Sequence, residues 1–311
     1  MLPKLRGGTS HAPSTTSLDL RLFVLRPLLL LAALFFVHST LRAQPVLELS
    51  LLTFNIRYAT AADGPNAWER RADFVAEVIR EADADVVGLQ EALRGQLDHL
   101  AAALPRYAEI GVGRDDGRTR GEHSTILYDS ARFAVAESGT FWLSDTPEMP
   151  GSMHWGNRIT RVCTWARLVE KATGRAVYVY NTHLDHESQP SRERSVRLIA
   201  ERIAAHTHAD PVVLMGDLNA GEDNPAVLFL TGGTDDRSAV VFRDSFRLLH
   251  PDTVEVGTFN AFRSDATRGP KIDYVLVPAE AEVIEAAIIR TRRDGRVPSD
   301  HFPVSARIRL P

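Results

Sequence analysis

The chain has 311 residues, of which 44% are hydrophobic, and a formal net charge of −4. This length is sufficient for one domain with a sizeable core. Its only cysteine, Cys163, excludes an intramolecular disulfide, and the apolar stretch around it predicts a buried, inert thiol. The acidic balance and the lack of a basic stripe disfavour a protein that binds nucleic acid through phosphate contacts alone.

The first 43 residues have the pattern of a secretory signal peptide, with basic residues before an apolar run from Leu28 to Val37. We predict cleavage after Ala43. A buried helix and an uncleaved membrane anchor are the alternatives, but the run is shorter than the about 20 residues that span a bilayer. The remaining residues, 44–311, carry a formal charge of −8. We predict that they form a single domain and a monomer, secreted or periplasmic, without a stable membrane span.

Apolar periodicity and turn residues then predict the elements in chain order. These are a strand over 47–56, a helix over 67–82, strands over 85–90, 124–128, 132–142, 161–170 and 176–182, a helix over 192–206, a strand over 211–215, a short helix over 225–230, and strands over 272–277, 282–290 and 304–310. Mixed helices and strands without regular βαβ alternation favour an α+β fold of two packed sheets flanked by helices.

Polar side chains follow several of these apolar strands. Glu91 comes directly after a buried strand, and a hard cation such as Mg²⁺ needs only one or two such carboxylates. Asp217 and Asn219 lie two residues apart on an extended segment, so their side chains face the same side. Asp300 and His301 follow near the end of the chain. Carboxylates, amides and histidines in one cleft suit metal-assisted hydrolysis of a phosphate ester.

The order of these residues resembles the endonuclease/exonuclease/phosphatase superfamily, the deoxyribonuclease I-like proteins, over residues 48 to 311. The matching positions are Asn55, Gln90, Glu91, His183, Asp217, Asn219, Asp273, Asp300 and His301. The resemblance implies a four-layer α-β-β-α sandwich with the site at one edge of the two sheets. It also implies a cation, Mg²⁺ with Mn²⁺ or Ca²⁺ as alternatives, held or oriented by Glu91, Asn55 and Asp300.

The resemblance further implies a role for each remaining residue. Asp217 orients or deprotonates the attacking water, and Asn219 holds an oxygen of the reacting phosphate. Two histidines are catalytic, His301 with Asp273 as its carboxylate partner. The second is His183, for which we expect Glu122 to be the partner.

Two arginines add candidate substrate contacts. Arg161, at the start of a predicted strand, can direct its guanidinium fork at phosphate. Arg114 lies in a glycine-containing loop from which it can close over the substrate.

Some loops resemble a secreted bacterial branch of the superfamily. The chain departs from that branch at Asn157, where aspartate is usual, and at Asn260, where histidine is usual. Both positions are expected to border the cleft, so they bear on the choice of substrate.

We therefore expect a secreted, Mg²⁺-dependent phosphoester hydrolase, a phosphodiesterase or a phosphatase. The substrate stays open between a nucleic acid or nucleotide and a phospholipid, inositol phosphate or sugar phosphate. A nuclease acting on DNA or RNA is the first alternative, which the charge disfavours. A non-catalytic phosphate-binding module and a surface protein that acts through protein contacts are alternatives of other classes.

Overall fold

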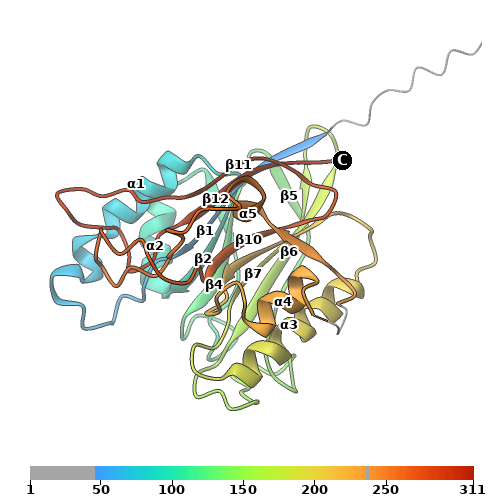
Figure 1. Ribbon diagram of the computed structural model, residues 1–311, viewed down its shortest axis with the longest axis horizontal. Helices are drawn as coiled ribbons and strands as arrows, with labels where there is room; N and C mark the ends of the chain where they lie inside the picture. The colour runs from blue at the N-terminus through green and yellow to red at the C-terminus, as the bar shows by residue number, and fades with distance from the viewer. Residues whose placement is uncertain (1–45, 235–237) are drawn as a thin grey trace, which may run out of the picture. The chain divides into compact units, whose positions relative to one another are not determined.

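The computed structural model describes residues 46–234 and 238–311, drawn in colour in Figure 1. The predicted signal peptide lies outside these residues. The chain divides into two units, residues 1–42 and 43–311, and the description below concerns the second unit. Across the described ranges, every helix is too short or too polar to cross a membrane.

The first sheet pairs strands from both ends of the second unit. Its strand order is β11 (Glu282–Ile288), β12 (Val304–Leu310), β1 (Leu47–Asn55), β2 (Val86–Ala92), β4 (His123–Asp129) and β3 (Tyr107–Ile110). The pair β1 and β2 runs parallel, and the other neighbours run antiparallel.

The second sheet repeats this mixed pattern with the middle of the chain. Its strand order is β5 (Phe133–Trp142), β6 (Val162–Glu170), β7 (Ala176–His183), β8 (Val212–Asp217), β10 (Asp273–Pro278) and β9 (Phe242–Asp244). The parallel pair here is β7 and β8. Each sheet thus has one central parallel pair within antiparallel neighbours.

Helices cover the outer face of each sheet (Figure 1). The first sheet carries α1 (Ala72–Ala82) and α2 (Arg94–Ala103), the second carries α3 (Gln189–Ala204) and α4 (Pro225–Thr231), and the short α5 (Ser245–Leu249) packs near β10 and β11. One buried apolar cluster lies between the sheets, and a further cluster lies under the helices of each outer layer. The predicted four-layer α-β-β-α sandwich is confirmed.

Most predicted elements form within a few residues of their expected bounds. The first helix is an exception because it begins at Ala72 and not at residue 67, after the 3₁₀ turns Gly64–Asn66 and Trp68–Arg70. Arg71 explains the late start, since its guanidinium donates to the backbone oxygens of Ile56 and Arg57 and holds the preceding loop against the sheet.

The elements that the sequence did not predict are α2, β3, β9 and α5. They are short or weakly amphipathic, and their pairing and packing partners define them. The predicted burial of Cys163 is confirmed, and this burial raises the pKa of its thiol.

Strand direction explains why the candidate residues meet. The parallel pairs end at a common edge, where Asn55 stands opposite Gln90 and His183 stands opposite Asp217. Because β10 runs antiparallel to β8, its first residue, Asp273, also pairs with Asp217.

A buried amide joins the two sheets just below this edge. Asn181 on β7 donates to the backbone oxygens of Leu89 and Thr125 in the first sheet, both at 2.8 Å. Its side-chain oxygen accepts from Gln90 Nε2 at 2.7 Å. Gly88 permits this approach, since a Cβ there would lie 2.8 Å from the Asn181 oxygen. These bonds fix one sheet against the other under the cleft.

We predict that Asn181→Ala lowers the free energy of unfolding by about 3 kcal/mol or more, because it leaves buried carbonyl groups without donors. Chemical denaturation of the full chain measures the change. Asn66→Ala, in the half-buried turn before α1, is the matched control and is expected to change it by less than about 0.5 kcal/mol. An unaltered unfolding midpoint for Asn181→Ala would contradict a structural role for the amide.

Candidate active site

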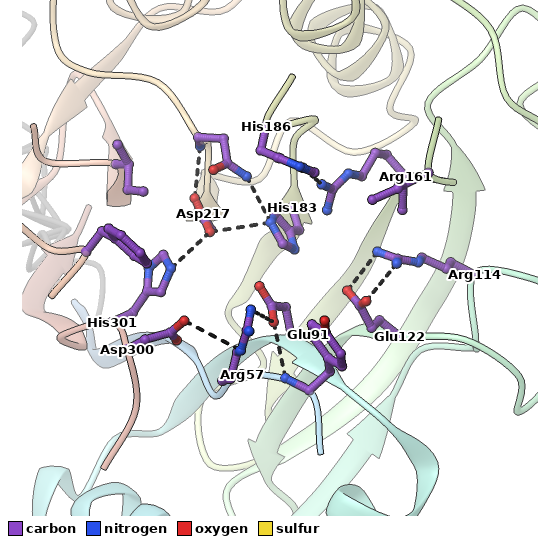
Figure 2. Close-up of a pocket in the computed structure, with 15 residues that line it drawn as sticks. Arg57, Glu91, Arg114, Glu122, Arg161, His183, His186, Asp217, Asp300 and His301 are labelled. Atoms are coloured by element: carbon purple, nitrogen blue, oxygen red, sulfur yellow. Dashed lines mark hydrogen bonds and ion pairs between the residues drawn. The ribbon is translucent and has the colours of Figure 1, made fainter. Parts of the chain in front are cut away.

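A cleft of about 430 Å³ opens at the common edge of the two sheets. Its walls hold nine of the eleven candidate residues, namely Glu91, Arg114, Glu122, Arg161, His183, Asp217, Asn219, Asp300 and His301. The other two candidates, Asn55 and Asp273, are buried behind this wall and bond to residues that line it. The predicted constellation therefore assembles in one place (Figure 2).

Glu91 enters the cleft through an irregularity at the end of β2. The register with β4 shifts between Leu89 and Ala92, and Glu91 has a φ of 62°. A bulge with left-handed backbone redirects a side chain, and such strain concentrates at functional sites. Asn55 Nδ2 and the backbone nitrogen of Tyr58 hold the carboxylate at 3.0 and 3.1 Å.

Asn55 orients carboxylates on two sides. Its Nδ2 also donates to Asp217 Oδ2 at 3.0 Å, and its Oδ1 accepts from the backbone of Arg57 at 3.0 Å. Between the two roles implied for Asn55, these bonds favour orientation of the acids over direct binding of a cation.

The positively charged side chain of Arg57 lies near both Glu91 and Asp300. The guanidinium of Arg57 lies 3.7 Å from Asp300 Oδ2 and 4.0 Å from Glu91 Oε2. Burial and the nearby Glu91 raise the pKa of Asp300, while His301 opposes this shift. Two largely buried carboxylates that attract a positive group provide the hard oxygen donors that Mg²⁺ prefers.

A second acidic cluster surrounds His301. Its Nδ1 donates to Asp273 at 2.9 Å, and its Nε2 lies 3.8 Å from Asp217 Oδ2. Burial alone would lower the pKa of His301, but Asp273 and Asp217 outweigh it and raise this pKa well above the usual value. Burial, followed by Asp273, raises the pKa of Asp217 to about 7.

The same three residues bring potential ligand atoms within 4.8 Å of one another, so they are a second place that suits a metal ion. The protonated ring of His301 already supplies positive charge between the two carboxylates. The two acidic clusters therefore differ in charge: Asp217 and Asp273 flank a protonated imidazole, whereas Glu91 and Asp300 face the guanidinium of Arg57.

The pKa of His183 is shifted in the opposite direction from that of His301. Burial first, and Arg161 second, lower its pKa well below the usual value, so the ring is neutral. Asn219 Nδ2 donates both to the carbonyl of Leu184 at 3.0 Å and to His183 Nε2 at 2.9 Å. Because Nε2 accepts this bond, the ring proton is on Nδ1.

The expected pairing of Glu122 with His183 was wrong. Both oxygens of Glu122 accept from Arg114, at 2.7 Å each, in a bidentate ion pair. The cause is the loop between Gly113 and Gly121, whose backbone bonds bring Arg114 back against Glu122. Glu122 still lines the cleft, where burial raises its pKa and Arg114 opposes the shift.

Arg161 lies beside this pair and is almost fully buried. It bonds to His186 Nδ1 at 2.9 Å, and its Nε is 3.6 Å from Asp185. Burial and the nearby Arg114 lower its pKa. In Figure 2 the arginines Arg114 and Arg161 stand on the side opposite to His301 and Asp300, with His183 and Glu91 between.

The cleft also has lining residues that were not predicted from the sequence. Arg57 lies two positions after Asn55 but beyond the end of β1 and with a φ of 57°, so strand alternation gave no signal for it. His186 lies three positions after His183, but no motif in the sequence marks it as a site residue. Phe259 belongs to a noted loop, but only the fold shows that its ring packs 5.2 Å from His301.

The two loops that depart from the bacterial branch do border the cleft. Asn157 lies two residues before the lining residue Ile159, and Asn260 directly follows Phe259. Within the described ranges, neither side-chain amide has a hydrogen-bond partner.

Solved structures of two Bacteroides proteins share this fold. An endonuclease/exonuclease/phosphatase family protein from Bacteroides thetaiotaomicron is 30% identical, with a TM-score of 0.78 over 86% of this chain and 97% of that one. A mannosyl-6-phosphatase from Bacteroides thetaiotaomicron is 31% identical, with a TM-score of 0.75 over 84% of this chain and 99% of that one.

A sequence relative is the uncharacterized protein R895 of Acanthamoeba polyphaga mimivirus, which is 25% identical over 187 residues. That match covers 50% of this chain and 27% of the relative's length. The model of the endonuclease/exonuclease/phosphatase family matches residues 52–301, which include every candidate residue of the cleft. The chain belongs to the endonuclease/exonuclease/phosphatase family.

Proposed function

We propose that the protein is a secreted, Mg²⁺-dependent hydrolase of phosphoesters. Family membership supports phosphoester hydrolysis as the reaction class. The observation that carries the proposal is the single cleft in which paired acids, Glu91 and Asp300, face an amide and two histidines. This arrangement supplies a place for a cation, a base for water and donors for phosphate oxygens.

Glu91 and Asp300 would hold the cation, with Asn55 fixing the orientation of Glu91. When bound there, a divalent cation neutralises charge on the phosphate and polarises it. Arg57 would then turn from the two carboxylates to its ion pair with Asp63, to which it already bonds at 3.1 Å.

The charge of each remaining side chain determines its proposed catalytic role. Asp217 has a pKa near neutrality, which suits a general base that accepts a proton from water. His301 is positively charged, so it stabilises negative charge on phosphate oxygens or gives a proton to the leaving oxygen. Neutral His183 donates a hydrogen bond through Nδ1 to a phosphate oxygen, and Asn219 holds the ring in this tautomer. To donate to phosphate as the resemblance implies, the amide of Asn219 would exchange one of its bonds to His183 and Leu184.

The substrate is more consistent with a small phosphoester than with duplex DNA. Residues 44–311 carry a formal charge of −8, whereas proteins that track along nucleic acid are basic. The similarity to a mannosyl-6-phosphatase supports a sugar phosphate among the small candidates.

A substrate panel tests this proposal. The full chain with Mg²⁺ is expected to hydrolyse a small phosphoester from a set of sugar phosphates, inositol phosphates, sphingomyelin, bis-p-nitrophenyl phosphate, plasmid DNA and RNA. We expect Glu91→Gln to abolish most metal-dependent turnover and to weaken Mn²⁺ binding in calorimetry, because it removes a charged ligand. Glu109→Gln, an exposed acid paired with Arg94, is the matched control with normal binding and turnover.

Two outcomes would contradict the proposal. Unchanged turnover and Mn²⁺ affinity in Glu91→Gln would remove this residue from the cation site. Faster hydrolysis of plasmid DNA or RNA than of every small ester, with steeply salt-dependent duplex binding, would favour the nuclease alternative.

The pH dependence of the rate follows from the two raised pKa values. The rate is expected to rise as Asp217 ionises and to fall as His301 loses its proton. Because the charge of Asp273 raises both pKa values, Asp273→Asn is expected to move both limbs of the profile to lower pH. Rates from about pH 4, near the ordinary carboxylate pKa, to about pH 11, well above the ordinary histidine pKa, measure this shift.

The variant His183→Ala is expected to differ from Asp273→Asn in its pH profile. It is expected to lower kcat by about 10²- to 10⁴-fold, as loss of a catalytic donor does, but to leave the alkaline limb in place. An alkaline limb that is unmoved in Asp273→Asn would contradict the assignment of His301 as the protonated group.

Export is predicted from the pattern of residues 1–43 alone. When expressed in a Gram-negative host, the full chain is expected outside the cytoplasm with Gln44 at or near its new N-terminus, as measured by fractionation and N-terminal sequencing. Replacing Leu30 and Leu31 in the apolar run with arginine is expected to retain the protein in the cytoplasm. Cytoplasmic protein that keeps Met1 would contradict the prediction.

A further inference from the structure

The closed end of the cleft contains buried donors without acceptors. Among the residues that the structure describes, Arg114 Nε, Arg161 Nε and His183 Nδ1 are buried and have no hydrogen-bond partner. All three side chains line the cleft. A buried donor without a partner is costly, so three at one place call for an acceptor that comes from outside the protein.

Neighbouring acids do not satisfy these donors. Glu122 accepts from the terminal nitrogens of Arg114 and leaves Nε free. Asp185 is 3.6 Å from Arg161 Nε, which is beyond hydrogen-bond distance. The acids therefore hold the guanidinium groups in position, and the Nε donors of both arginines stay free for an acceptor from outside the protein.

The space beyond the arginines is nearly closed. A side pocket between Arg114, Arg161, Glu122 and strands β4 and β6 holds about 10 Å³. This volume admits about one water molecule and no organic group. The side pocket therefore has no room for an organic group behind the arginines.

The opposite side of the cleft is apolar and open. Phe259 is 49% exposed and packs its ring edge against His301, and Ile272 lines the same cleft. This side therefore offers an organic group an apolar surface along Phe259, away from the arginines.

We propose that this cleft selects phosphomonoesters, whose terminal phosphate lies against Arg114, Arg161 and His183 while the single organic group lies along Phe259. This inference rests on the proposed hydrolase function and specifies its substrate class. A monoester presents three free phosphate oxygens and close to two negative charges, which match three donors and two arginines. A diester has one fewer free oxygen and a second organic group, for which the closed end has no space.

The reaction balances without a further reactant. The oxygen of water forms a bond to phosphorus, and the bond from phosphorus to the ester oxygen breaks. One proton of the water ends on the released alcohol, and inorganic phosphate remains at the arginines.

Two chromogenic esters with the same leaving group test this selectivity. The full chain is expected to have a higher kcat/KM for p-nitrophenyl phosphate than for bis-p-nitrophenyl phosphate. Arg161→Gln is expected to lower the monoester value by about 10- to 100-fold and the diester value by much less. It is also expected to weaken binding of inorganic phosphate by a similar factor in calorimetry, a readout that needs no turnover.

Two further variants secure the interpretation. The double variant Arg114→Gln with Glu122→Gln removes a bonded pair together, so no buried charge is left unpaired, and it is expected to show the same selective loss. Arg158→Gln, whose side chain is 84% exposed, is the matched control and is expected to keep both values.

The outcomes separate the two proposals. Equal losses on both esters in Arg161→Gln, or a wild-type preference for the diester, would overturn monoester selection while the hydrolase function stands. Failure to hydrolyse either ester with Mg²⁺, Mn²⁺ or Ca²⁺, with no binding of phosphate, would overturn both.

Discussion

The site depends on how firmly the two sheets hold their relative position, because each sheet supplies half of the cleft. Glu91 and Asn55 come from the first sheet, and His183 and Asp217 come from the second. The amide of Asn181 crosses between them with three bonds of 2.7 to 2.8 Å. Apolar packing between sheets is tolerant of small slides, whereas these directed bonds are not. The amide thus sets the spacing that Asn55 needs to reach both Glu91 and Asp217.

A second anchor ties the end of β1 to the segment that carries Asp300. Buried Arg71 donates to the carbonyl of Ile56, after β1, and to that of Pro298, before Asp300. Burial lowers the pKa of Arg71 to about 10, so the group stays charged at neutral pH while its donors are used by backbone oxygens. Ser299 adds a bond to the backbone of Asn55 at 2.7 Å. The end of β1, whose Asn55 bonds to Glu91, is therefore fixed beside the segment of Asp300 before any cation binds.

Much of this arrangement was accessible from the sequence because strand ends identify it. Glu91 and Asp217 follow apolar runs, and parallel strands bring such ends to one edge. The hydrogen-bond partners of the site side chains were harder to predict from the sequence, because loop conformations determine them. The loop before Glu122 delivers Arg114 to it, a pairing that no spacing rule indicates. The position of Arg57 depends on a φ of 57°, a backbone state that sequence patterns rarely reveal for arginine.

The distribution of charge in the cleft explains how a protein with a net negative charge can bind an anionic substrate. A long polyanion such as duplex DNA contacts a large part of the protein surface, so the net negative charge of residues 44–311 repels it. Charges separated by more than the Debye length, about 8 Å at physiological salt, are largely screened, so a small phosphate responds mainly to its immediate neighbours. Those neighbours include Arg114, Arg161 and protonated His301, and a cation on Glu91 and Asp300 would offset the acids that line the same cleft. Acidity of the whole chain and affinity for a small anion are thus compatible.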